Sequence, residues 1–125
     1  MPIKPHIDRT KQLTIFVCNG KITPQHIIEA LTAVFAEGLT KDVLWDLRRG
    51  ELEIDDPTAQ IEQLAKLSDQ EREIRAQGKT ALVGSDDFTY GVLRMYETFA
   101  EIHGLVHEVQ VFRGMEEARR WIEGE

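Results

Sequence analysis

The sequence is poor in the residues that staple secreted domains and in the apolar runs that cross membranes. Its 125 residues include one cysteine, Cys18, so no internal disulfide can form. Residues 1–5 lack the apolar core of a signal peptide, and nowhere do about 18 apolar residues follow one another. These absences predict a cytoplasmic protein with no membrane span.

Clustered positive charge is missing as well. The chain has 22 acidic against 15 basic residues, which gives a net charge of −7. Its only basic pairs, Arg48-Arg49 and Arg119-Arg120, are not interleaved with aromatic residues. Because nucleic-acid-binding surfaces need clustered basic side chains to neutralise phosphates, we expect no DNA or RNA partner.

The signatures of catalytic and metal chemistry are also lacking. The four histidines, at positions 6, 26, 103 and 107, do not have metal-ligand spacing, and no Cys-x-x-Cys or His-Glu-x-x-His motif occurs. No Gly-x-Ser-x-Gly elbow or phosphate-cradling glycine loop occurs either. Cys18 is expected to be a small core residue rather than a nucleophile. We therefore expect a protein without metal, cofactor or enzymatic activity.

What the sequence does contain is a regular alternation of strand and helix patterns over a single domain, residues 1–125. Apolar patterning predicts strands over 3–8, 13–18, 43–47, 80–83 and 109–112. Four helices are predicted, over 24–37, from 57 toward 78, from 87 to about 103, and over 115–122. The expected N-caps are Thr23 for the first helix, Asp55 or Asp56 for the second, and Ser85 or Asp86 for the third. Pro5 marks the first strand as a sheet edge.

This order, β-β-α-β-α-β-α-β-α, predicts an α/β fold with a mixed five-stranded sheet, four helices and an antiparallel N-terminal edge strand. Short segments within it carry a family resemblance, namely Asn19-Gly20-Lys21-Ile22-Thr23, Leu44-Trp45-Asp46-Leu47-Arg48, Gly91 to Glu97, and Val111-Phe112-Arg113 with Trp121-Ile122. They resemble the SpoIIAA-like branch of the STAS superfamily. That superfamily includes bacterial anti-sigma-factor antagonists, and the branch has been compared with CRAL-TRIO lipid-binding domains. The resemblance implies a STAS-like fold and a regulatory, protein-binding role.

One segment departs from the family pattern. In the phosphorylation-switched antagonists, an Asp-Ser pair opens the helix after the third strand, and the serine accepts phosphate. Here that segment reads Asp55-Asp56-Pro57-Thr58, so Thr58 is the only hydroxyl there. The two aspartates already occupy the positive end of the helix. The sequence therefore argues against a phosphorylation switch.

Polar residues gather where the predicted strands end. If the fold is as expected, a ligand or partner edge is formed by Asp46, Arg48, Arg49, Ser85, Asp86, Tyr90 and Arg113. One interpretation is a polar pocket for an anion, with the arginines as ligands. The other, which we favour, is that Asp46 pairs with a neighbouring arginine while Ser85 and Asp86 cap a helix.

The third predicted helix is apolar over an unusually wide arc. A helix interface or cavity would be lined by Phe88, Val92, Leu93, Met95, Tyr96 and Phe99. Three explanations remain open. The arc binds another protein, most simply as a homodimer; it lines a cavity for a small lipophilic ligand with the second helix as a movable cover; or neighbouring helices bury it.

The first functional hypothesis is accordingly a non-catalytic regulatory or protein-interaction module of STAS-like type. The alternative is a carrier or sensor of a small apolar or amphipathic ligand held between the helices and the sheet.

Overall fold

Strands and helices alternate along the chain and build one mixed sheet. The computed structural model describes residues 2–68, 78–102, 104 and 108–124. Its strands are β1 (Ile3–Asp8), β2 (Leu13–Ile22), β3 (Asp42–Leu52), β4 (Lys79–Val83) and β5 (Glu108–Phe112). Its helices are α1 (Pro24–Glu37), α2 (Pro57–Ser68), α4 (Asp87–Ile102) and α5 (Met115–Ile122). The predicted α/β architecture is confirmed.

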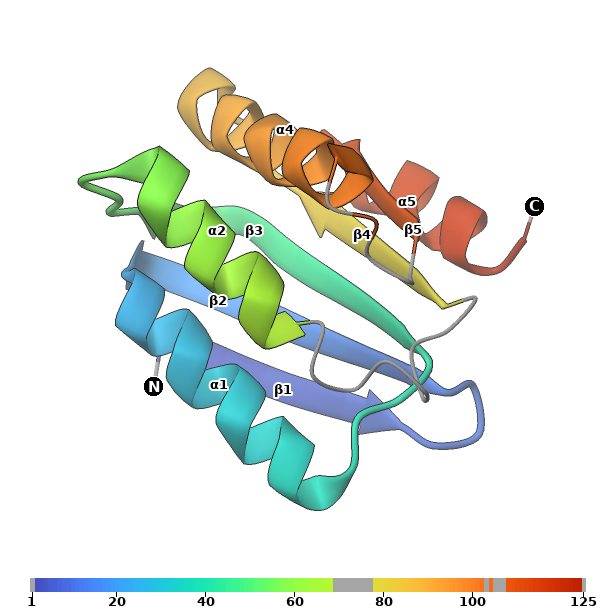
Figure 1. Ribbon diagram of the computed structural model, residues 1–125. Coiled ribbons are helices and arrows are strands. Elements are labelled where there is room, and N and C mark those ends of the chain that lie inside the picture. The colour runs from blue at the N-terminus through green and yellow to red at the C-terminus, as the bar shows by residue number, and fades with distance from the viewer. Residues whose placement is uncertain (1, 69–77, 103, 105–107, 125) are drawn as a thin grey trace.

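The strands lie side by side in chain order, β1-β2-β3-β4-β5 (Figure 1). β1 pairs with β2 in antiparallel orientation, whereas β2 to β5 are parallel to one another. β1 is thus an edge strand, and Pro5, which has no amide hydrogen to donate, lies in it as predicted.

The sheet separates two apolar layers. α1, α2 and α4 lie over one face, where Phe16, Trp45 and Leu82 belong to the larger core. α5 packs against β3, β4 and β5 on the opposite face, where Leu44 and Val83 belong to a second core. The near-continuous apolar run of β3 is explained by this burial on both faces.

Side chains cap the helices where the sequence indicates. Thr23 Oγ1 accepts a hydrogen bond from the backbone N–H of His26 at 3.2 Å, and His26 Nδ1 accepts one from the backbone N–H of Thr23 at 3.1 Å. At the start of α4, Asp86 Oδ2 accepts from the backbone N–H of Thr89 at 2.9 Å. Both caps satisfy amides that have no partner within the helix.

β2 and β3 are longer than predicted. The sequence pattern ends them at residues 18 and 47, but they continue to Ile22 and Leu52. Their last residues pair with each other, as in Asn19 with Arg49 and Lys21 with Glu51. The pairing is made by the backbone, so the polar side chains of this extension give no strand pattern to read.

α2 begins at the predicted residue, where Asp56 Oδ1 accepts from the backbone N–H of Ala59 at 3.4 Å. The predicted continuation toward Gly78 falls on residues 69–77, which lie outside the described residues. His103 and His107, two of the four histidines that lack metal-ligand spacing, lie outside them too.

Gly84 lets the end of β4 approach α4 closely. A Cβ atom at this position would lie 2.7 Å from Cγ2 of Thr89 and 3.0 Å from Cδ1 of Leu93. We therefore expect Gly84→Ala to lower the free energy of unfolding by about 1–3 kcal/mol in urea denaturation. Gly91→Ala is the control, because a Cβ there meets nothing within 4 Å. It should raise stability by up to about 1 kcal/mol. Equal effects of the two substitutions would contradict the close approach.

Candidate functional site

An apolar cavity lies between the sheet and the three helices that share its larger core. It has a volume of about 90 Å³ and is partly open to solvent. Fourteen apolar residues and two with hydroxyl groups line it, namely Ile27, Leu31, Phe35, Leu39, Val43, Trp45, Leu47, Leu52, Ile54, Ile61, Leu64, Thr80, Leu82, Val92, Leu93 and Tyr96. No charged side chain is among these sixteen, so the arrangement suits an apolar group.

The floor of the cavity is formed by strands and the walls by helices. Trp45 of β3 belongs to the floor, and its ring stacks on that of Phe16 in β2 with centroids 4.0 Å apart and planes 13° apart. Leu31 of α1, Leu64 of α2 and Leu93 of α4 contribute to the walls. Such a stacked aromatic pair stabilises the floor beyond the gain from burial alone.

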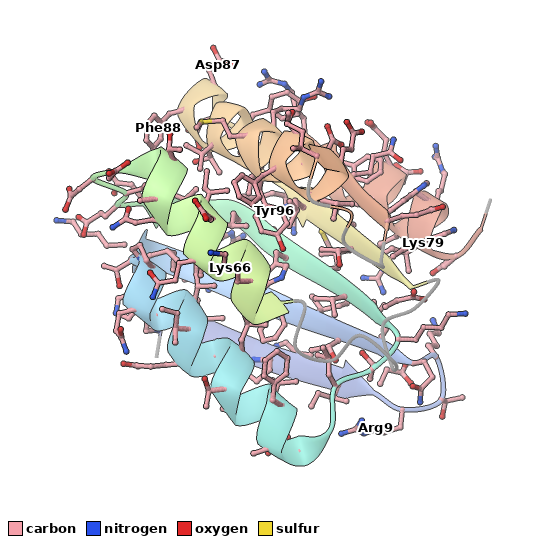
Figure 2. The ribbon with its side chains drawn as sticks, viewed as in Figure 1. Arg9, Lys66, Lys79, Asp87, Phe88 and Tyr96 are labelled. Atoms are coloured by element: carbon pink, nitrogen blue, oxygen red, sulfur yellow. The ribbon has the colours of Figure 1, made fainter. Side chains whose placement is uncertain are left out.

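The six residues singled out on α4 do not behave as one group. Val92, Leu93 and Tyr96 line the cavity, and Phe99 is half-buried against the same core. Phe88 and Met95, in contrast, are 57% and 42% exposed. Figure 2 shows Tyr96 between α4 and α2, and Phe88 at the first turn of α4. The wide apolar arc is therefore divided between two surfaces of α4, one that faces the cavity and one that faces solvent.

Asp46 and Arg48 form a local ion pair on the α5 side of the sheet. Oδ1 and Oδ2 of Asp46 each accept from the Arg48 guanidinium at 2.9 Å, and Oδ1 also accepts from the Arg48 backbone N–H at 3.1 Å. β3 has one extra residue here relative to β2, and the carboxylate binds an amide that this irregularity removes from regular pairing. Burial raises the pKa of Asp46, but the hydrogen bonds from Arg48 more than offset this, so the pKa lies below 3.8.

Arg113 follows the end of β5 and is held on the face of the sheet opposite α5. Its guanidinium donates to the Ser85 carbonyl at 3.2 Å, lies 3.0 Å from Oδ1 of Asp87, and stacks on the Tyr90 ring 4.2 Å from its centroid. Asp86 caps α4, and its hydrogen bonds to Thr89 lower the pKa of its carboxyl.

The predicted strand-end residues are thus divided between two separate groups, with Arg49 apart from both. Asp46 lies opposite Val83 in the sheet, between the inward-facing Trp45 and Leu47, so its side chain is on the α5 face. Tyr90 belongs to α4 on the opposite face and holds Arg113 there. Arg49 lies farther along, where β3 pairs with Asn19. Within each group the charged atoms already have partners, which is the arrangement that caps and ion pairs produce.

Cys18 is a buried residue of the larger core. Burial and the neighbouring negative charge of Asp46 raise the pKa of its thiol to about 12. Since the thiolate is the nucleophile, a thiol with so high a pKa is unreactive near neutral pH. The interpretation of Cys18 as a core residue agrees with this position.

Most of the cavity lining was not singled out from the sequence. Residues such as Leu39, Leu52 and Ile54 follow the same apolar pattern whether they face a void or a neighbouring side chain. The available signal was indirect and came from the wide apolar arc of α4.

Comparison with known proteins identifies the fold. No protein-family model matches the sequence, and no curated protein matches it. An uncharacterised protein of the DUF3478 family with a SpoIIAA-like fold, from Shewanella loihica, superposes with a TM-score of 0.61 at 16% identity, covering 96% of this chain and 93% of that one. The chain has the SpoIIAA-like fold.

Two further solved structures support this. The anti-sigma factor antagonist SpoIIAA in its unphosphorylated form gives a TM-score of 0.54 at 14% identity, covering 98% of this chain and 99% of that one. The Bacillus cell fate determinant SpoIIAA in its phosphorylated form gives 0.53 at 11% identity, covering 95% and 98%. At these identities the likeness concerns the fold. Among the helices described, none is long and apolar enough to span a membrane.

The Asp46 carboxylate makes a testable contribution to stability. Because its folded pKa is depressed, the contribution is present above the ordinary pKa of 3.8 and is lost as the pH falls through the folded value. Asp46→Asn should cost about 1–2 kcal/mol near pH 7, a modest figure because Arg48 is partly exposed. The cost should shrink on acidification below pH 3.8, as followed by urea denaturation at several pH values. A cost that is independent of pH would contradict the assignment.

Proposed function

We propose that the protein is a non-catalytic module that carries or senses a small apolar or amphipathic ligand. The observation that carries this proposal is the cavity beneath α1, α2 and α4, with its apolar lining and partial opening to solvent. Burying apolar ligand surface there gains roughly 25 cal/mol per Å².

The volume restricts the ligand. An apolar cavity of about 150 Å³ in another protein stays dry and binds benzene. At about 90 Å³ this cavity is smaller than that one, so it suits the end of a hydrocarbon chain rather than a whole ring. A longer amphipathic molecule would place its apolar end inside and its polar end at the opening.

α2 is suited to act as the cover of the cavity. Its principal contacts are with α1 and α4 rather than with strands. Ile61 and Leu64 face the cavity, whereas Lys66 and Glu62 form an ion pair toward solvent with 3.0 Å between Nζ and Oε1. Because its backbone lies closer to these two helices than to the strands, we expect α2 to be the helix that moves outward to admit a ligand.

A second candidate function is regulation through protein interaction. It is favoured by the exposed apolar side chains of α4 and by the shared fold with SpoIIAA, which is an anti-sigma factor antagonist. A phosphorylation switch is not part of this proposal, because Thr58 stands where the switch would need the serine of an Asp-Ser pair.

Native mass spectrometry of protein purified gently from its host tests the ligand proposal. We expect extra mass that is lost on denaturation, because a non-covalent ligand dissociates when the cavity unfolds. Protein that carries no extra mass, and whose melting temperature does not rise with hexanoate as a short-chain probe, would contradict it.

A pair of variants tests whether the ligand binds in this cavity. Leu64→Trp fills the cavity from α2 and should abolish both the extra mass and the rise in melting temperature with hexanoate. Ile122→Val, in the core on the opposite face, has a similarly modest stability cost of about 1 kcal/mol but leaves the cavity intact. It should retain the ligand. Equal loss of ligand in both variants would exclude the cavity as the site.

A further inference from the structure

The outward face of α4 repeats every seven residues. Phe88, Met95 and Ile102 form an apolar stripe in which the side chains are 57%, 42% and 74% exposed. The small residues Gly91 and Thr98 lie beside this stripe, and all of these positions are exposed. A seven-residue repeat of apolar positions is the pattern by which helices pack along one another.

Charged residues lie on the same side of the stripe as Gly91 and Thr98, one step farther around the helix. Asp87, Arg94 and Glu101 are also seven residues apart and exposed. The face therefore carries an acid, a base and an acid in sequence. Figure 2 shows Asp87 and Phe88 together at the start of α4. Such flanking charges select the partner and the orientation of a packed helix.

Packing within the monomer does not explain why a glycine stands at position 91. It lies inside α4, and a Cβ atom there would meet nothing within 4 Å. Glycine within a helix is destabilising relative to alanine. Such a residue is useful where another backbone or side chain must come close, and the monomer supplies none.

We infer that α4 binds the α4 of a second copy in antiparallel orientation, with each Arg94 paired to Glu101 of the other copy. In this register Met95 lies opposite Thr98 of the second copy, and Ile102 lies over its Gly91. The inference rests on the second function above, protein interaction, and is independent of ligand binding.

The charges select this register over the neighbouring one. With Met95 opposite Thr98, Arg94 lies about two residues, or about 3 Å along the axis, from the opposing Glu101. In the register with Met95 opposite Met95 of the second copy, Arg94 of one copy comes equally close to Arg94 of the other, and the two repel each other. Two-fold symmetry forms the favourable pair twice.

The ion pair that Arg94 already makes is compatible with this arrangement. Its Nη1 lies 3.3 Å from Oε1 of Glu97 in the same helix, and the side chain is 57% exposed. A guanidinium has five N–H donors, so it can contact Glu97 and an opposing carboxylate together. One helix thus supplies the apolar stripe, the small residues that receive it, and both signs of charge, which favours a second copy over an unrelated protein.

Sedimentation velocity of the full chain tests this inference. We expect a dimer at about 0.1 mM that dissociates on dilution and at high salt. Met95→Glu should produce a monomer, because it places a charge in the stripe. Ala36→Glu, which adds the same charge to the exposed surface of α1, should remain dimeric.

Charge reversal gives a second test that does not depend on Met95. Arg94→Glu and Glu101→Arg should each weaken the dimer at least about tenfold, since like charges then meet. The double variant Arg94→Glu/Glu101→Arg restores the pairs and should restore the dimer. A wild-type chain that is monomeric at about 0.1 mM overturns the inference, although a different protein could still bind this face. A dimer unaffected by these changes also overturns it.

Discussion

Three helices must share one face of this sheet, because each parallel connection leads from a strand to its immediate neighbour. In the strand order β1-β2-β3-β4-β5, each of the helices α1, α2 and α4 connects one parallel strand to the next, and all three connections cross the sheet in the same direction. Crossovers of this kind are right-handed in nearly all proteins, so all three fall on the same side. α5 follows the last strand, lies outside this constraint, and covers part of the other face.

Crowding on that face explains both the cavity and the exposed side of α4. Strands are about 4.8 Å apart, so five of them form a sheet roughly 24 Å wide, whereas three helices with a diameter of about 10 Å need about 30 Å side by side. α2, in the middle, rests on α1 and α4, and space remains beneath it over Trp45. α4 directs Val92 and Leu93 into that space and leaves Met95 at the surface.

Much of this was predictable from local chemistry. The cap at Thr23, the edge strand marked by Pro5 and the helix start at Asp86 each depend on one or two residues and their hydrogen bonds, and the structure confirms them. The pairing of Asp46 with an adjacent arginine follows the same logic, since the two are neighbours on one strand.

What was not predictable depends on contacts between distant segments. The extension of β2 and β3 is made by backbone pairing of polar residues such as Lys21 and Glu51, for which no side-chain pattern exists. The split of the α4 arc into an inner and an outer stripe depends on where α2 lies. Apolar periodicity reports that a residue avoids water, but it does not report whether a cavity, a neighbour or a second chain covers it.

Xenon binding to a crystal of the protein tests the cavity beneath α2 most directly, because xenon enters dry apolar cavities without requiring a particular ligand. A xenon peak among Leu31, Trp45, Leu64 and Leu93 is the expected result. Closely packed side chains or ordered water at that position, with no xenon, would contradict the apolar cavity and the ligand proposal that depends on it.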